Sequence, residues 1–103
     1  MGYSVLATNK FLVNNLPYDL ERDLIPVVYV GYIPLMLVTP PSFAPNSVAE
    51  LIALLKANPG KYNYASLGVG SLAHIAGEIF NRAAKAKSVH IPFKFIGDAI
   101  TET

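Results

Sequence analysis

Residues 62–78, YNYASLGVGSLAHIAGE, decide the fold, because they predict a short strand, a glycine-rich turn and an amphipathic helix that begins at Ser71. Gly68 and Gly70 allow the backbone to curl tightly, since glycine has no Cβ to clash. The first turn of a helix presents backbone N–H groups without intrahelical partners, at the positive end of the helix dipole. The sequence therefore predicts an anion site at this turn.

The side chains around the turn indicate which kind of anion it would hold. Ser66 and Ser71 add hydroxyl donors, and the turn itself contains no lysine or arginine. Neutral donors of this kind suit a carboxylate that is bound reversibly. His74 is the titratable side chain nearest the turn, and two interpretations stay open: a solvated helix residue paired with Glu78, or a donor to the bound carboxylate.

Two other interpretations of this stretch compete with an anion site. Many α/β proteins have a glycine-rich turn here simply because the chain reverses sharply. Gly68, Gly70 and Ala73 also fit the dinucleotide pattern G-x-G-x-x-G/A. That pattern needs an acidic residue at the end of the next strand, whereas the first acid after residues 88–91 is Asp98. A nucleotide-dependent enzyme is therefore the weakest alternative.

Composition excludes several classes of protein. The chain has 103 residues, 52% apolar and 15% charged, so it is one domain or part of one. A small domain this apolar predicts self-association, because it cannot cover its own apolar surface. A net charge of +1 argues against nucleic-acid partners. The chain has no cysteine, and no acids cluster around its two histidines, so we expect neither a metal nor another cofactor.

The apolar tract Ile25 to Phe43 raises the question of a membrane span. Four prolines interrupt it, and the uninterrupted pieces are too short to cross about 30 Å of hydrocarbon. We interpret the tract as two buried strands and expect no membrane insertion. The N-terminus opens without a basic segment, so the sequence predicts no signal peptide.

The remaining signals predict strands that alternate with helices, which is typical of an α/β protein with a mostly parallel sheet. The capping box Ser47 to Glu50, in which Glu50 would bond the Ser47 amide, predicts one helix, and Asn58-Pro59-Gly60 predicts its end. The predicted strands are Tyr3–Ala7, Val27–Val30, Leu35–Thr39 and Ser88–Ile91, with an irregular stretch at 9–17 and a charged connector at 18–24. The helix from Ser71 is predicted to bury Leu72, Ile75, Ala76, Ile79, Phe80 and Ala83.

Three aromatic side chains of the predicted strands are interpreted as structural residues. Tyr62 and Tyr64 alternate along one strand, which favours a place in the core or a pocket wall. His90 lies within the last strand and is interpreted as a packing residue or a backbone partner. No Ser-His-Asp set or paired carboxylates emerge, so nothing in the sequence demands an enzyme.

Several linked motifs along nearly the whole chain resemble the substrate-binding receptors of tripartite tricarboxylate transporters, the Bug receptors. They are Leu16-Pro17-Tyr18-Asp19, Asp23-Leu24-x-Pro26-Val27, Ser47-Val48-x-Glu50-Leu51, Lys56-Ala57-Asn58-Pro59-Gly60-Lys61, Tyr64-Ala65-Ser66, Gly68-x-Gly70-Ser71, His74-x-Ala76-Gly77-Glu78 and His90-x-Pro92.

This resemblance implies a periplasmic two-lobed clamshell of the type II binding-protein fold, which holds small carboxylates between its lobes. It places the glycine-rich turn against the ligand carboxylate, with His74 just behind it. The predicted ligand-binding residues are Ser66, Gly68, Val69, Gly70, Ser71 and His74.

The chain also departs from the family's pattern. It corresponds to roughly a third of a family member, the size of one domain or less. Where the family has a Tyr-Lys-Gly turn, residues 93–96 are Phe-Lys-Phe-Ile. We therefore expect residues 1–103 to form a single α/β domain, part of one lobe, that binds a carboxylate weakly and is not an enzyme.

The alternative is a truncated protein that persists as an oligomer without a ligand. Assembly is expected in both cases, as a homodimer or larger even oligomer whose interface is rich in residues 25–43. By resemblance the protein is periplasmic; expressed as it stands, without a signal peptide, it would be cytoplasmic.

Overall fold

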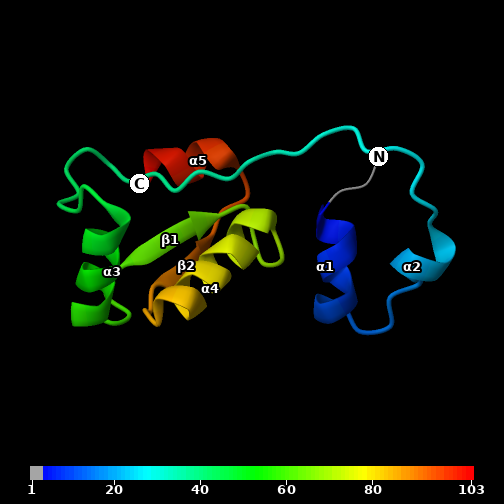
Figure 1. The fold of residues 1–103 in the computed structure, drawn as a ribbon, viewed down its shortest axis with the longest axis horizontal. Coiled ribbons are helices and arrows are strands. Elements are labelled where there is room, and N and C mark those ends of the chain that lie inside the picture. The colour runs from blue at the N-terminus through cyan, green and yellow to red at the C-terminus, as the bar shows by residue number, and fades with distance from the viewer. Residues whose placement is uncertain (1–3) are drawn as a thin grey trace. The chain divides into compact units, whose positions relative to one another are not determined.

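The computed structural model describes residues 4–103, and the chain divides into two compact units, residues 1–36 and 37–103. We describe each unit by itself (Figure 1). The first contains α1 (Ser4–Leu12) and α2 (Leu20–Asp23). The second contains α3 (Val48–Ala57), β1 (Asn63–Ser66), α4 (Leu72–Ala84), β2 (Val89–Pro92) and α5 (Ile96–Thr101).

The first unit begins with a helix where the sequence predicted a strand. Residues 4–7 belong to α1, so the predicted strand Tyr3–Ala7 is wrong, and Tyr3 lies outside the described residues. A strand needs a neighbour for its backbone polar groups, and the described part of this unit contains no strand, whereas a helix satisfies those groups locally. The predicted turn at Asn14-Asn15 is confirmed, and Asn15 has a φ of 59°.

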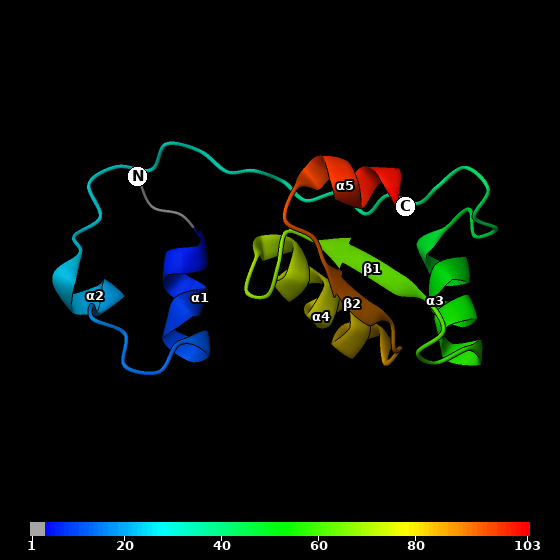
Figure 2. The same cartoon turned by 180° about the vertical axis from the view of Figure 1, so that it is seen from behind.

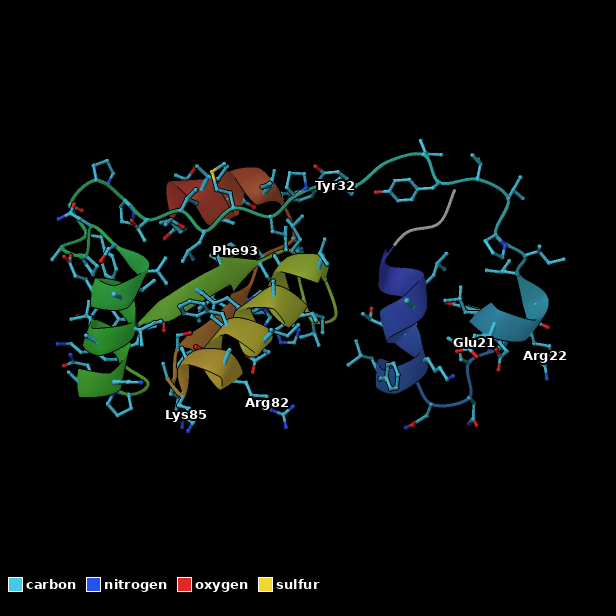
Figure 3. All side chains as sticks on the ribbon, in the orientation of Figure 1. Glu21, Arg22, Tyr32, Arg82, Lys85 and Phe93 are labelled. Atoms are coloured by element: carbon cyan, nitrogen blue, oxygen red, sulfur yellow. The ribbon has the colours of Figure 1, made fainter. Side chains whose placement is uncertain are left out.

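A short helix, α2, lies within the predicted charged connector. Asp19 is its N-cap, and its Oδ1 accepts hydrogen bonds from the N–H groups of Arg22 at 3.2 Å and Glu21 at 2.9 Å. These hydrogen bonds hold the pKa of Asp19 below its usual value. Figure 3 shows Glu21 and Arg22 on this helix. Asp19 followed by charged helix formers was the available signal for it.

The chain from residue 24 to residue 40 forms neither helix nor strand. The predicted strands Val27–Val30 and Leu35–Thr39 are therefore wrong, and so is their predicted burial, since Val27 is 92% exposed. Tyr32, labelled in Figure 3, lies in this segment. Strand-forming residues do not make a strand unless another strand pairs with them.

The second unit starts with α3, which the capping signals predicted. The Ser47 hydroxyl accepts a hydrogen bond from the Glu50 N–H at 3.2 Å. The Glu50 carboxylate reaches back one residue further than predicted, because it accepts from the Asn46 N–H at 2.8 Å. The helix buries Leu51 and Leu55 and ends at Ala57, before the predicted Asn-Pro-Gly stop.

Two parallel strands form the sheet of the second unit. β1 pairs with β2 in a register that runs from Asn63 opposite Val89 to Ser66 opposite Pro92. The observed strand is shifted by one residue from the predicted Ser88–Ile91. The parallel sheet with flanking helices confirms the predicted α/β class at this coarse level.

Helix α4 lies along the sheet in both views of the ribbon (Figures 1 and 2). It begins after Ser71, as predicted, but its apolar face is only partly covered. Ile75, Ala76 and Phe80 are half-buried, whereas Leu72, Ile79 and Ala83 are exposed, which corrects the prediction for these three. The reason is that a sheet of two four-residue strands is too narrow to cover the whole face of a 13-residue helix.

The C-terminal end of α4 is held to Ser88, the residue before β2, by the buried Asn81. The Ser88 hydroxyl donates to Asn81 Oδ1 at 2.8 Å, and the Asn81 amide donates to the Ser88 carbonyl at 3.4 Å. Lys85 ends the helix in the left-handed region, with φ 50°. Figure 3 shows Arg82 and Lys85 at this end of α4.

Candidate ligand-binding site

The glycine-rich turn joins the end of β1 to the first turn of α4, and both ribbon views show these two ends together (Figures 1 and 2). Gly68 and Gly70 have φ values of +107° and +85°, a region that favours glycine. The Ser71 N–H closes the turn by donating to the Gly68 carbonyl at 3.2 Å. The sharp turn that the two glycines predicted is therefore confirmed.

Several hydrogen-bond donors of this turn are bonded to acceptors within the turn itself or in the first turn of α4. The Gly68 N–H donates to the Ser66 hydroxyl at 3.2 Å, and that hydroxyl lies 3.1 Å from the Gly68 carbonyl. The Ser71 hydroxyl caps α4 by accepting from the His74 N–H at 3.2 Å. The Gly70 N–H donates to the ring Nδ1 of His74 at 3.1 Å. These bonds make the turn rigid.

Two backbone N–H groups in the first turn of α4 take no part in these hydrogen bonds. The part of the chain that the structure describes supplies no acceptor for the N–H groups of Leu72 and Ala73. These are the positions at which a helix has no intrahelical partner and the helix dipole is positive. Leu72 and the neighbouring Val69 are exposed. Among the six predicted site residues, Ser66 and Gly70 are buried, and Gly68, Ser71 and His74 are half-buried.

His74 faces the sheet. Its ring stacks on the ring of His90, with centroids 4.1 Å apart and planes inclined by 29°. No ion pair among the described residues joins it to Glu78, so the interpretation of His74 as a solvated partner of Glu78 is wrong. Since Nδ1 accepts a hydrogen bond from the Gly70 N–H, the His74 ring connects the turn to the sheet.

His90 is the member of this cluster that the sequence interpretation missed. Its Nε2 lies 2.5 Å from the Ser66 hydroxyl, so it contacts the turn through a predicted site residue. Burial, and then the charge of His74, lower the pKa of His90. The parallel register places His90 directly opposite Tyr64, and no local sequence pattern reveals this register.

Tyr64 and Glu78 complete the cluster. The Tyr64 hydroxyl donates to Glu78 Oε1 at 2.6 Å, and the Tyr64 ring lies 5.2 Å from the ring of His90. Burial, and then the bond to Glu78, raise the pKa of Tyr64 well above its ordinary value. A Cβ at Gly77 would overlap the Tyr64 ring, so the helix backbone approaches this ring closely. Tyr64 thus links the strand to the helix.

We also searched the described residues for hollows, metal-ligating groups and membrane-spanning helices. A shallow hollow along α4 contains none of the six predicted residues and is lined by Ile75, Glu78, Ile79, Asn81, Arg82 and Ala86. No group of three or more metal-ligating side chains occurs in residues 4–103. Across the same residues, no helix has the length and apolar character that a membrane crossing requires.

The chain matches a known protein family over its whole length and several curated proteins over most of it. A family model described as the tripartite tricarboxylate transporter family receptor matches residues 1–103. Protein BugT of Bordetella pertussis is 39% identical over 97 residues, which cover 94% of this chain and 30% of BugT. A UPF0065 protein of the same organism is 38% identical over 105 residues, 95% of this chain and 32% of that protein.

A more distant relative is a UPF0065 protein from the tcbD–tcbE intergenic region of Pseudomonas sp. strain P51. It is 29% identical over 97 residues, which cover 94% of this chain and 29% of that protein. The chain therefore spans about 30% of the length of the curated relatives that it matches.

Proposed function

The chain belongs to the tripartite tricarboxylate transporter receptor family, and we propose that its β1–turn–α4 region binds one carboxylate group of a small di- or tricarboxylate or an amino acid. The observation that carries this proposal is the pair of N–H groups of Leu72 and Ala73, which have no acceptor among the described residues and stand at the start of a helix. A carboxylate at this position would accept from both N–H groups and meet the positive end of the helix dipole.

The turn favours reversible binding of an anion of modest charge. The turn, residues 67–71, contains no lysine or arginine, so the attraction comes from neutral N–H and O–H donors. Such bonds to a charged acceptor each contribute about 1.5–3 kcal/mol. A receptor must also release its ligand unchanged, so the proposal includes no catalytic residue.

The proposed architecture is part of one lobe of a type II binding-protein fold, with residues 1–103 as a single domain in the periplasm. The family relationship and the parallel strands with flanking helices support it. Since the chain spans about 30% of its relatives, it would supply one side of the ligand site. We therefore expect affinity in the millimolar range, about −4 kcal/mol, for this chain alone.

Calorimetry with citrate, succinate and glutamate tests the proposal, with two variants at one position. Leu72→Pro removes one of these two N–H groups, and proline suits the first position of a helix. Ser71 has φ −63° and ψ 157°, which is the conformation that a residue before proline prefers. Leu72→Ala is the matched control, because it truncates the same side chain and keeps the N–H. We expect Leu72→Pro to weaken binding about tenfold, the loss of one such hydrogen bond.

Two results would contradict this function. One is the absence of heat at millimolar concentrations of all three ligands while circular dichroism shows a folded protein. The other is equal affinity for Leu72→Pro and Leu72→Ala.

We also propose that residues 25–43 are covered by a second copy of this chain. Residues 24–39 contain no charged residue, and Val27 and Met36 are 92% and 85% exposed. A stable interface buries about 800 Å² from each partner, and this exposed apolar segment would contribute a large part of it. Its extended backbone can also pair with the same segment of the partner.

Light scattering at micromolar concentration tests this assembly. The expected mass is an even multiple of 11.1 kDa. Val27→Glu places a charge in the segment and should shift the protein toward the monomer. Val48→Glu, at an exposed position in α3, is the matched control and should leave the mass unchanged. A wild-type mass of one chain would contradict the proposal.

A further inference from the structure

The hydroxyl of Ser66 lies among three hydrogen-bonding groups at the end of β1. It accepts from the Gly68 N–H at 3.2 Å and lies 3.1 Å from the Gly68 carbonyl. The ring Nε2 of His90 lies 2.5 Å from the same hydroxyl. Ser66 is only 4% exposed, so the protein itself, and not a ligand, supplies the partners of this hydroxyl.

The hydrogen-bonding capacity of the hydroxyl indicates which ring nitrogen of His90 carries the hydrogen. A serine hydroxyl has one hydrogen to donate and two lone pairs that accept. The Gly68 N–H takes one lone pair, and the Gly68 carbonyl takes the hydrogen. The second lone pair then receives a hydrogen from Nε2 of His90. If Nε2 accepted instead, the hydroxyl hydrogen would be drawn away from the Gly68 carbonyl, so only the Nε2–H form satisfies all three contacts.

The Gly68 peptide groups connect this hydroxyl to the start of α4. The Gly68 carbonyl also accepts from the Ser71 N–H at 3.2 Å, and Ser71 is the N-cap of α4. The N–H groups of the proposed carboxylate site belong to the next two residues. Gly68 has a φ of +107°, in a region that leaves glycine wide freedom, so hydrogen bonds have to fix its orientation. The direction of the first turn of α4 therefore depends on the Ser66 hydroxyl.

The ring of His90 is itself held in place. The parallel register puts His90 opposite Tyr64, and the two rings lie 5.2 Å apart between centroids. The His90 ring also stacks on the ring of His74, with centroids 4.1 Å apart. Contacts with two rings restrict the orientation of the imidazole, so Nε2 stays directed at Ser66.

We propose that His90 is a positioning residue of the carboxylate site, a role that rests on the proposed function. Its Nε2–H donates to the Ser66 hydroxyl and thereby directs the hydroxyl hydrogen to the Gly68 carbonyl. The turn that is fixed in this way holds the two N–H groups of the site in one orientation. His90 touches no ligand and acts on affinity through Ser66.

Nuclear magnetic resonance of the full chain without ligand tests this link. At about pH 8 the His90 ring is neutral, and we expect its Nε2 to carry a hydrogen. The Gly68 amide signal should move in His90→Phe, which keeps a ring for the stack and removes Nε2, and in Ser66→Ala. It should stay close to its wild-type position in His90→Gln, whose side-chain amide can still donate to Ser66. A wild-type Nε2 without a hydrogen, or equal movement in His90→Phe and His90→Gln, would overturn the positioning role.

Citrate titration at the same pH tests whether the link reaches the site, with circular dichroism to confirm that each variant is folded. We expect His90→Phe and Ser66→Ala each to weaken citrate binding about fivefold, the effect of one hydrogen bond, and His90→Gln to bind about as tightly as the wild type. Because both changes break the same link, the double variant should also lose about fivefold, and not the product of about 25-fold.

The outcomes separate the positioning role from the proposed function. Wild-type citrate affinity in His90→Phe, or the full product of the two losses in the double variant, would overturn the role and leave the carboxylate site standing. If His90→Phe does not fold, wild-type affinity in Ser66→Ala would overturn it equally. A Gly68 signal that responds as expected, without citrate binding in the wild type, would support the link to the turn and contradict the proposed function.

Discussion

Residues 47–92 and residues 24–39 are both rich in apolar side chains, yet only the first region forms ordered elements. In residues 47–92, two serine caps, a glycine turn and buried Leu51 and Leu55 define each helix and strand. In residues 24–39 the strand-forming side chains are exposed and no strand forms. The difference shows that caps and turns act within a few residues, whereas a strand depends on a partner.

The largest expected effect comes from the same truncation made in each region. Leu55→Ala removes a side chain that is 4% exposed, so we expect a loss of about 3 kcal/mol in the free energy of unfolding. In the dissociated chain, Leu37→Ala, at a position 59% exposed, should change it by less than about 0.5 kcal/mol. Urea denaturation measures both. Equal losses would show that residues 24–39 have a core of their own.

Glycine-to-alanine changes sharpen the comparison by testing close packing. The new Cβ of Gly77→Ala would overlap the Tyr64 ring, and moving the ring would break its bond to Glu78. We expect a loss of about 2 kcal/mol, despite the better helix propensity of alanine. The new Cβ of Gly31→Ala, in residues 24–39, has nothing within 4 Å in the single chain, so this change should be neutral in the dissociated chain. Thermal unfolding that leaves Gly77→Ala at the wild-type midpoint would contradict the close contact.

These contrasts also explain how much of the molecule could be predicted from its sequence. The caps at Ser47 and Ser71 and the glycine turn were predictable, because each depends on residues within about four positions. The contact between Ser66 and His90 spans 24 positions and depends on the register of two strands, which no local pattern reveals. Helix α1 was mistaken for a strand because its apolar residues carry no information about a missing neighbour.

The pH dependence of stability tests the histidine cluster within the ordered region. The pKa of His90 is lower in the folded than in the unfolded protein, so the unfolded state binds more protons as pH falls below about 6.5. We expect stability to be greatest above this pH and to decrease as pH falls toward the folded-state pKa. His90→Gln should reduce the decrease, as measured by urea denaturation at several pH values. An unchanged slope in His90→Gln would exclude His90 as its source.

The smallest expected effect concerns the end of α4. Lys85 is in the left-handed region, which glycine adopts without strain, so Lys85→Gly should stabilise the chain by about 0.5–1 kcal/mol. Lys87→Gly is the control, because Lys87 does not have a positive φ and glycine there only adds freedom to the unfolded chain. Calorimetric unfolding that ranks Lys87→Gly above Lys85→Gly would contradict the assigned helix end.

Titration of the labelled chain with citrate, followed by nuclear magnetic resonance, tests most directly the central claim that the ordered β1–turn–α4 region is the ligand site. We predict that millimolar citrate shifts the amide signals of Leu72, Ala73 and the turn, and leaves those of residues 24–39 in place. Shifts confined to residues 24–39, or no shift in a folded chain at millimolar citrate, would contradict the account.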